Sequence, residues 1–133
     1  MSEKSQWIVD PTKPPTRKNK SPEHDIQTKL CSVLEAEGLL YSATVGGVRL
    51  AMHTAKKMKE SGYKKGIPDV LVFEPRGEYV GLAIEVKTGK GVASPEQKEW
   101  QRELNKRGWD AHICYGLDEC LDVLYDYFEL WPH

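Results

Sequence analysis

The apolar residues of this 133-residue chain change their spacing several times, and each change predicts a different element. From Ser21 to Gly38 they recur at helical spacing, after a Ser-Pro-Glu start that is typical of a helix N-terminus. The same spacing predicts further helices at about 48–61, 94–108 and 117–129. Short apolar runs predict strands at 39–45, 70–73, 80–87 and 111–115.

The predicted order is helix, strand, helix, strand, strand, helix, strand, helix. Interleaved helices and strands favour an α/β fold, in which helices flank a small mixed sheet. Residues 74–78 have the composition of a hairpin turn, so we expect the strands on either side to pair antiparallel. The helix at 94–108 permits a parallel crossover between the strands that flank it, and we expect it to bury Trp100 and Leu104.

The first 20 residues are rich in Lys, Pro, Ser and Thr, which predicts a flexible basic tail (1–20) ahead of one domain (21–133). No apolar stretch approaches the ~18 residues that a membrane span needs, and the tail lacks the apolar core of a signal peptide. Three cysteines without metal-type spacing predict buried, reduced thiols: Cys31, Cys114 and Cys120. These features together predict a soluble, cytoplasmic protein that makes no membrane contact.

A net charge of −1 hides an uneven distribution of charged residues. Positive charge is concentrated at 46–65, whereas 109–129 is acidic and has no Lys or Arg. A phosphate backbone responds to the local patch, so the overall charge does not argue against a nucleic-acid partner. The residues that we expect to contact DNA are Arg49, His53, Lys56, Lys57, Lys64 and Lys65. The alternative is an ordinary solvated helix face.

The strands at 70–73 and 80–87 carry the chemistry. Asp69 opens the first strand, and Glu85 and Lys87 lie in the second on one face, because side chains two apart point the same way. Carboxylates are ligands that Mg²⁺ prefers, and a neighbouring Lys can hold a water or a phosphate oxygen. The pattern indicates a metal-dependent phosphodiesterase. The alternatives are a solvated surface pair on an edge strand for Glu85 and Lys87, and a turn residue for Asp69.

Pro68-Asp69 followed by Glu85-Val86-Lys87 resembles the Pro-Asp…(Asp/Glu)-x-Lys signature of restriction-endonuclease-like nucleases. With Gly66-Ile67 and with Ser94-Pro95-Glu96-Gln97 and Trp100, the chain is similar to the virus-type replication-repair nuclease branch, the VRR-NUC domain. The resemblance covers about 21–128 and implies a restriction-endonuclease-like core.

The resemblance also implies roles for the residues of the strand motif. Asp69, Glu85 and the backbone carbonyl of Val86 would bind Mg²⁺ or Mn²⁺. Lys87 would orient and polarise the attacking water and stabilise charge on the phosphate.

Two helix residues match the family as well. Gln97 would help to build the active site, although a capping-box partner of Ser94 is an equally open interpretation. Glu23 would complete a second metal site or hold an outer-shell water. Glu23 shares a helix face with Ile26 and Leu30, whereas Asp25 is expected to point outward. The alternative for Glu23 is a favourable charge at a helix N-terminus.

Stand-alone members of this family resemble Holliday-junction resolvases. We therefore expect a DNA endonuclease that cleaves four-way junctions or other branched DNA as a homodimer, since a symmetric junction matches a symmetric enzyme. Compact forms of the family are common in phage, so the protein could be phage-encoded and act in the host cell. The alternatives are a less selective DNA nuclease, a non-catalytic nucleic-acid-binding module of the same fold, and a dimeric structural protein with an acidic C-terminal helix.

Overall fold

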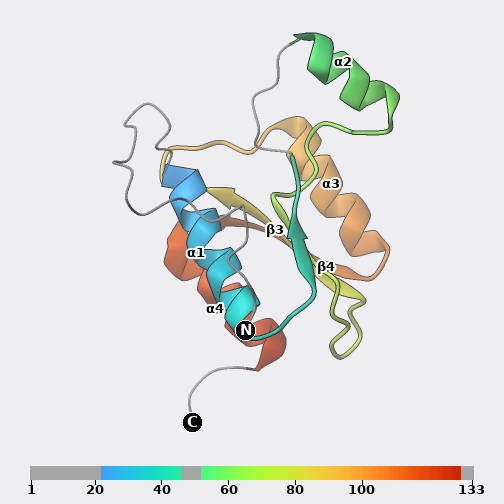
Figure 1. The fold of residues 1–133 in the computed structure, drawn as a ribbon. Coiled ribbons are helices and arrows are strands. Elements are labelled where there is room, and N and C mark those ends of the chain that lie inside the picture. Colours follow the sequence, from blue (N-terminus) through green and yellow to red (C-terminus); the bar gives the residue numbers. More distant parts are fainter. Residues whose placement is uncertain (1–21, 46–51, 130–133) are drawn as a thin grey trace, which may run out of the picture.

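The computed structural model describes residues 22–45 and 52–129, and its elements follow the predicted order (Figure 1). The helices are α1 (Pro22–Ala36), α2 (Met52–Glu60), α3 (Pro95–Lys106) and α4 (Gly116–Phe128). The strands are β1 (Tyr41–Ala43), β2 (Val70–Val72), β3 (Gly81–Lys87) and β4 (Trp109–Tyr115). Several predictions concern parts of the chain outside the described residues. These parts are the predicted tail (1–20), the predicted start of the second helix, Arg49 and the side chain of His53.

The strands form one mixed sheet in the order β1-β2-β3-β4. β2 pairs antiparallel with both β1 and β3, whereas β3 and β4 are parallel, as the hairpin and the crossover predict. β3 therefore lies inside the sheet, and the interpretation of Glu85 and Lys87 as a surface pair on an edge strand is wrong. β4 begins at Trp109, earlier than predicted, because it pairs along the whole of β3.

The apolar core lies on the side of the sheet that α1 and α4 cover (Figure 1). Alternate residues of β3 point to this side and are fully buried: Leu82, Ile84 and Val86. They belong to one cluster with Leu30 and Leu34 of α1 and Leu124 of α4. Because side chains alternate along a strand, the other residues of β3, including Glu85 and Lys87, face the opposite side.

On that opposite side, α3 packs mainly against β4. This contact is polar, because the side chains of Gln101 and Asn105 form hydrogen bonds with the backbone of Ala111. Trp100 and Leu104 are only partly buried, so the prediction that the helix buries them is wrong. The side of α3 that contacts the sheet carries amides, and its apolar residues lie on the flank.

Among the described residues, no helix has the length and apolar character that a bilayer crossing requires. All three cysteines are free, with Cys114 and Cys120 buried and Cys31 partly buried. Burial raises the pKa of the Cys31 thiol to about 11. The prediction of buried thiols is confirmed in full for Cys114 and Cys120 and in part for Cys31.

The segment that leads into β2 is held closely against the start of α3. Gly66 has a φ of 95°, and a Cβ there would lie 2.7 Å from the carbonyl carbon of Glu96. The indole N–H of Trp100 donates to the carbonyl of Lys65 at 3.0 Å. The hydroxyl of Thr44 donates to the carbonyl of Pro68 at 2.6 Å. These contacts fix the path of the chain immediately before Asp69.

We expect Gly66→Ala to be less stable than Gly62→Ala by about 1–3 kcal/mol, the usual cost of overpacking. Gly62 also has a positive φ, 110°, but an added Cβ there would meet nothing within 4 Å. The two variants share the backbone strain, so their difference isolates the contact with Glu96. Denaturant unfolding measures both. Equal losses would show that the backbone conformation alone requires glycine at position 66.

Candidate active site

Three side chains meet where β2 begins and β3 ends. Asp69 and Glu85 are 7% and 5% exposed. The backbone N–H of Val86 donates to Asp69 Oδ2 at 2.8 Å, which ties the start of β2 to the end of β3. Lys87 Nζ lies 3.8 Å from Glu85 Oε2. The structure thus brings Asp69, Glu85 and Lys87 together as the strand pattern predicts, while their chemical roles stay predictions.

The two carboxyl groups disfavour each other's charge. Burial raises the pKa of Asp69, and the hydrogen bond from Val86 opposes this shift. Burial, followed by the charge of Asp69, raises the pKa of Glu85 from 4.5 to about 8, although the ammonium group of Lys87 pulls it down. Without a bound cation, the pair therefore holds a proton to higher pH than an exposed carboxyl group would.

One oxygen of Glu85 has no donor. Oε2 accepts a hydrogen bond from Gln97 Nε2 at 2.8 Å, whereas Oε1 is buried and has no hydrogen-bond partner. A buried carboxylate oxygen without a donor is costly, and either a proton shared with Asp69 or a bound cation would satisfy it. Mg²⁺ is commonly held by one or two carboxylates and keeps several waters. The donor set therefore fits a hard divalent ion.

Glu23 borders this site from α1. It is half-buried and Asp25 is exposed, so their predicted orientations are confirmed. A Cβ on Gly91 would lie 3.4 Å from Glu23 Oε2 and 3.3 Å from Lys87 Cδ, so both side chains flank the same glycine. The charge of Glu23 also raises the pKa of Asp69 and of Glu85. Within the described residues, however, no three Asp, Glu, His or Cys side chains form a group that could hold a metal.

Gln97 makes both of the contacts that the sequence left open as alternatives. Its side-chain Oε1 accepts a hydrogen bond from the backbone N–H of Ser94 at 2.8 Å, and its backbone N–H donates to Ser94 Oγ at 3.1 Å. These two bonds complete a capping box. Its Nε2 donates to Glu85. The capping box fixes the direction of the Gln97 amide. The Gln97 side chain therefore both caps the start of α3 and orients the carboxylate of Glu85.

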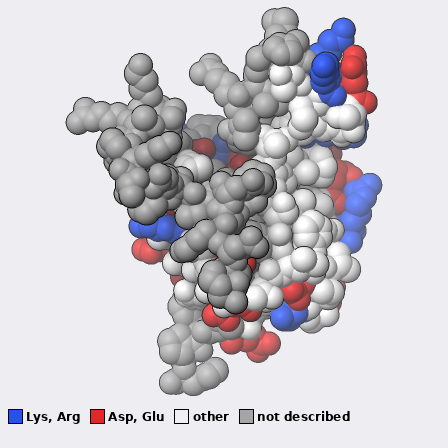
Figure 2. Space-filling view, in the orientation of Figure 1, with Lys and Arg blue, Asp and Glu red and all other residues white. Residues whose placement is uncertain are grey.

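The predicted DNA-contacting lysines lie on two segments. Lys56 and Lys57 are exposed on α2, which stands apart from the sheet in Figure 1. In Figure 2 the basic side chains at the upper right belong to this helix and have acidic atoms beside them. Lys64 and Lys65 are also exposed, on the segment that leads to Asp69. Arg49 and the side chain of His53 are outside the described residues.

Two contacts near the site were not anticipated from the sequence. The first is the approach of Glu23 and Lys87 to Gly91, for which the only signal was a glycine soon after the strand motif. The second is the hydrogen bond from Trp100 to the Lys65 carbonyl. Its signal was available, because a partly buried indole N–H usually finds an acceptor.

The mixed four-stranded sheet and its flanking helices place this chain among α/β proteins. The model of the VRR-NUC domain matches residues 21–118, so the chain belongs to the VRR-NUC family, a family of nuclease domains. This confirms the family and the fold class that the motifs predict.

Solved structures agree with this assignment. One, described as "VRR_NUC domain protein", has a TM-score of 0.70 and 28% identity, with coverage of 84% of this chain and 92% of the other. A second, described as "VRR_NUC domain", has a TM-score of 0.58 and 23% identity, with coverage of 81% of this chain and 99% of the other. The second likeness concerns the fold alone. The comparison with curated proteins gave no match.

The raised pKa of Glu85 predicts how the stability of the metal-free protein depends on pH. Between pH 4.5 and about 8 the folded state keeps a proton that the unfolded state has lost. We therefore expect the free energy of unfolding to fall as pH rises through this range, and to fall less in Glu85→Gln, which has no carboxylate to ionise. Added Mg²⁺ should stabilise the wild type more at the upper end of the range.

Urea unfolding in EDTA, repeated across this pH range for both proteins, measures the effect. Identical slopes in the wild type and Glu85→Gln would show that Glu85 does not titrate in this window.

Proposed function

We propose that this chain is a Mg²⁺- or Mn²⁺-dependent DNA endonuclease that cleaves Holliday junctions or other branched DNA as a homodimer. The observation that supports it best is the pair of buried carboxylates, Asp69 and Glu85, beside the ammonium group of Lys87. Such a pair is unfavourable for folding by itself. The same pair can hold a divalent ion next to a phosphodiester, which would offset its cost to folding.

In this proposal Asp69, Glu85 and the backbone carbonyl of Val86 hold the ion, which would activate water and neutralise charge on the phosphate. The Val86 N–H holds Asp69, and Gln97 holds Glu85, so both carboxylates are oriented by partners of their own. Lys87 Nζ donates to the attacking water or to a phosphate oxygen. Attack by water on phosphorus with departure of the 3′ oxygen leaves a 5′-phosphate and a 3′-hydroxyl.

The exposed lysines are proposed to bind the DNA backbone, which would position the strand without reading its sequence. This set comprises Lys56, Lys57, Lys64 and Lys65, together with Arg49 and His53. Their support is the exposure of the four lysines and the direct connection of Lys65 to the segment that carries Asp69. We place the activity in the cytoplasm, where a phage-encoded enzyme would meet replicating DNA.

A homodimer is proposed because a four-way junction has two-fold symmetry, so two symmetric active sites would meet two equivalent strands. Glu23 is proposed to complete a second metal site or to hold an outer-shell water, since its carboxylate borders Lys87 across Gly91.

Asp69→Asn tests the catalytic role of Asp69. The amide oxygen of Asn can still accept the hydrogen bond from Val86, so the fold is expected to survive while the charge is lost. We expect DNA cleavage to fall more than about 100-fold, since loss of even an outer-shell partner costs 10–100-fold. The assay uses a labelled four-way junction with Mg²⁺ or Mn²⁺. Undiminished cleavage by Asp69→Asn would remove Asp69 from the metal site.

The same assay tests substrate choice. Paired nicks at symmetric positions, together with a solution mass of two chains, would support junction resolution. Efficient cutting of linear duplex would instead indicate a less selective nuclease. DNA binding without any cleavage in either protein would indicate a non-catalytic module.

Glu23 and Asp25 form a matched pair of acids in the first turn of α1, one half-buried towards the site and one exposed. We expect Glu23→Gln to lower cleavage by about 10–100-fold and to raise the Mg²⁺ concentration needed for half-maximal activity. Asp25→Asn should change neither quantity. If both variants lost activity equally, a general effect of charge at the helix N-terminus would explain the result.

A further inference from the structure

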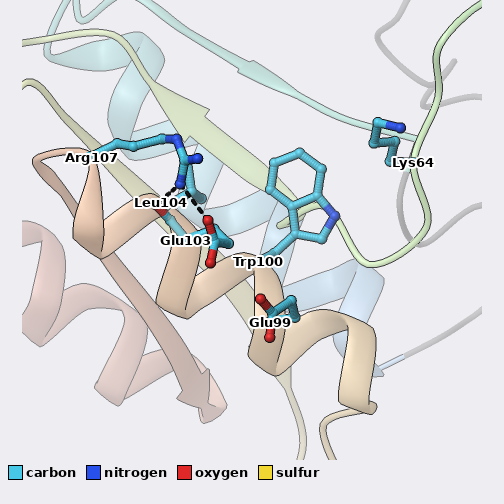
Figure 3. A pocket seen from close by; sticks show the side chains of 6 residues that line it. All are labelled: Lys64, Glu99, Trp100, Glu103, Leu104 and Arg107. Carbon is cyan, nitrogen blue, oxygen red and sulfur yellow. Dashed lines mark hydrogen bonds and ion pairs between the residues drawn. The ribbon is translucent and has the colours of Figure 1, made fainter.

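A cleft lies on the flank of α3, where its lining residues run from Glu99 to Arg107 (Figure 3). It has a volume of about 380 Å³, within the range of roughly 300–1,000 Å³ that small-ligand clefts occupy. Its lining residues are Lys64, Glu99, Trp100, Glu103, Leu104 and Arg107. Trp100 at the near end of the cleft is less than one helical turn, about 5.4 Å of rise, from Gln97, so this end borders the candidate active site.

The floor of this cleft is aromatic and apolar. Figure 3 shows the indole of Trp100 standing between α3 and the segment that carries Lys64. The hydrogen bond from its N–H to the Lys65 carbonyl, at 3.0 Å, fixes the edge of the ring. The ring stays partly exposed, and so does Leu104. The cleft thus presents an immobilised aromatic ring, which is the usual platform for stacking a planar group.

The charged residues that line the cleft are two acidic residues, Glu99 and Glu103, and two basic residues, Lys64 and Arg107. Glu99 and Glu103 lie along α3, paired with Arg102 and with Arg107 and Lys106 respectively. These ion pairs offset the negative charge of the two carboxylates, whose remaining lone pairs can still accept hydrogen bonds from the amino groups of a base. Lys64 stands across the cleft, on the exposed basic segment, where a phosphate of the same strand would meet it.

We propose that this cleft binds one unstacked nucleobase of the strand being cleaved, stacked on Trp100, with an adjacent phosphate on Lys64. The inference rests on the proposed function, because it needs DNA at the neighbouring site. Bases inside a duplex are stacked on each other and cannot enter, whereas bases at a branch point or in a single strand can. The cleft would therefore select unpaired structure without selecting sequence, since every base has a π-face.

Binding without cleavage tests this proposal, so its failure is distinct from failure of the nuclease assignment. A fluorescein-labelled single strand of about 12 nucleotides is titrated in EDTA with the wild type, Trp100→Phe and Trp100→Leu. Stacking is worth about 1–3 kcal/mol per base, so Trp100→Leu should bind about 5- to 150-fold more weakly. Trp100→Phe loses the hydrogen bond to Lys65 but keeps a ring, and it should bind within a few-fold of the wild type.

Single abasic sites, placed in turn along the strand, supply a readout that a merely structural role of Trp100 would not move. The wild type should bind the strand more weakly when one particular base is missing. Trp100→Leu should bind that abasic strand almost as well as it binds the intact strand, because it has already lost the stacking contact. Equal losses in both proteins at every position would overturn the proposal. So would wild-type affinity of Trp100→Leu for the intact strand.

Lys64→Gln, matched against Lys29→Gln on the exposed side of α1, tests the phosphate contact. Only Lys64→Gln should weaken binding and reduce the salt dependence, by about one unit of slope. If Trp100→Leu instead changed the solution mass and left DNA affinity intact, the cleft would be a contact between subunits, and the proposal would be wrong.

Discussion

The structure around the site depends on one constraint: two carboxylates must stay side by side where water cannot screen them. Glu85 cannot move away, because β3 pairs with a strand on each side. Asp69 is held to the same strand through the N–H of Val86. The free energy that opposes this repulsion comes from the other side of β3, where Leu82, Ile84 and Val86 are fully buried. Alternation along one strand thus supplies both the chemistry and the packing that supports it.

α3 connects the parts that this constraint must keep in place. Gln97 contacts Glu85 on β3, and Trp100 and Glu96 contact the segment that delivers Asp69 to β2. A shift of the helix would therefore disturb both carboxylates at once. The contact between Gln97 and Glu85 lies within the parallel crossover from β3 through α3 to β4, whereas the contacts with Lys65 and Gly66 reach back to the segment before β2.

Periodicity predicted the order of the elements and the antiparallel and parallel pairings, because those depend on local pattern and turn chemistry. It failed where tertiary contacts decide. Trp100 and Leu104 have the spacing of a buried helix face, but amides at Gln101 and Asn105 make the contact with the sheet instead. The position of Glu85 inside the sheet could not be read from its flanks, since edge and inner strands share the same alternation. The role of Gln97 was ambiguous because a capping-box partner of Ser94 and an active-site residue would both be a glutamine at this position.

The polar attachment of α3 has a consequence for how the sequence of β4 can vary. Gln101 and Asn105 bond to backbone atoms of Ala111, which are present whatever side chain occupies that position. The helix is therefore held by directional bonds that do not depend on which side chain occupies position 111 of β4. Packing between side chains, by contrast, would have to be rebuilt each time one of the partners changed.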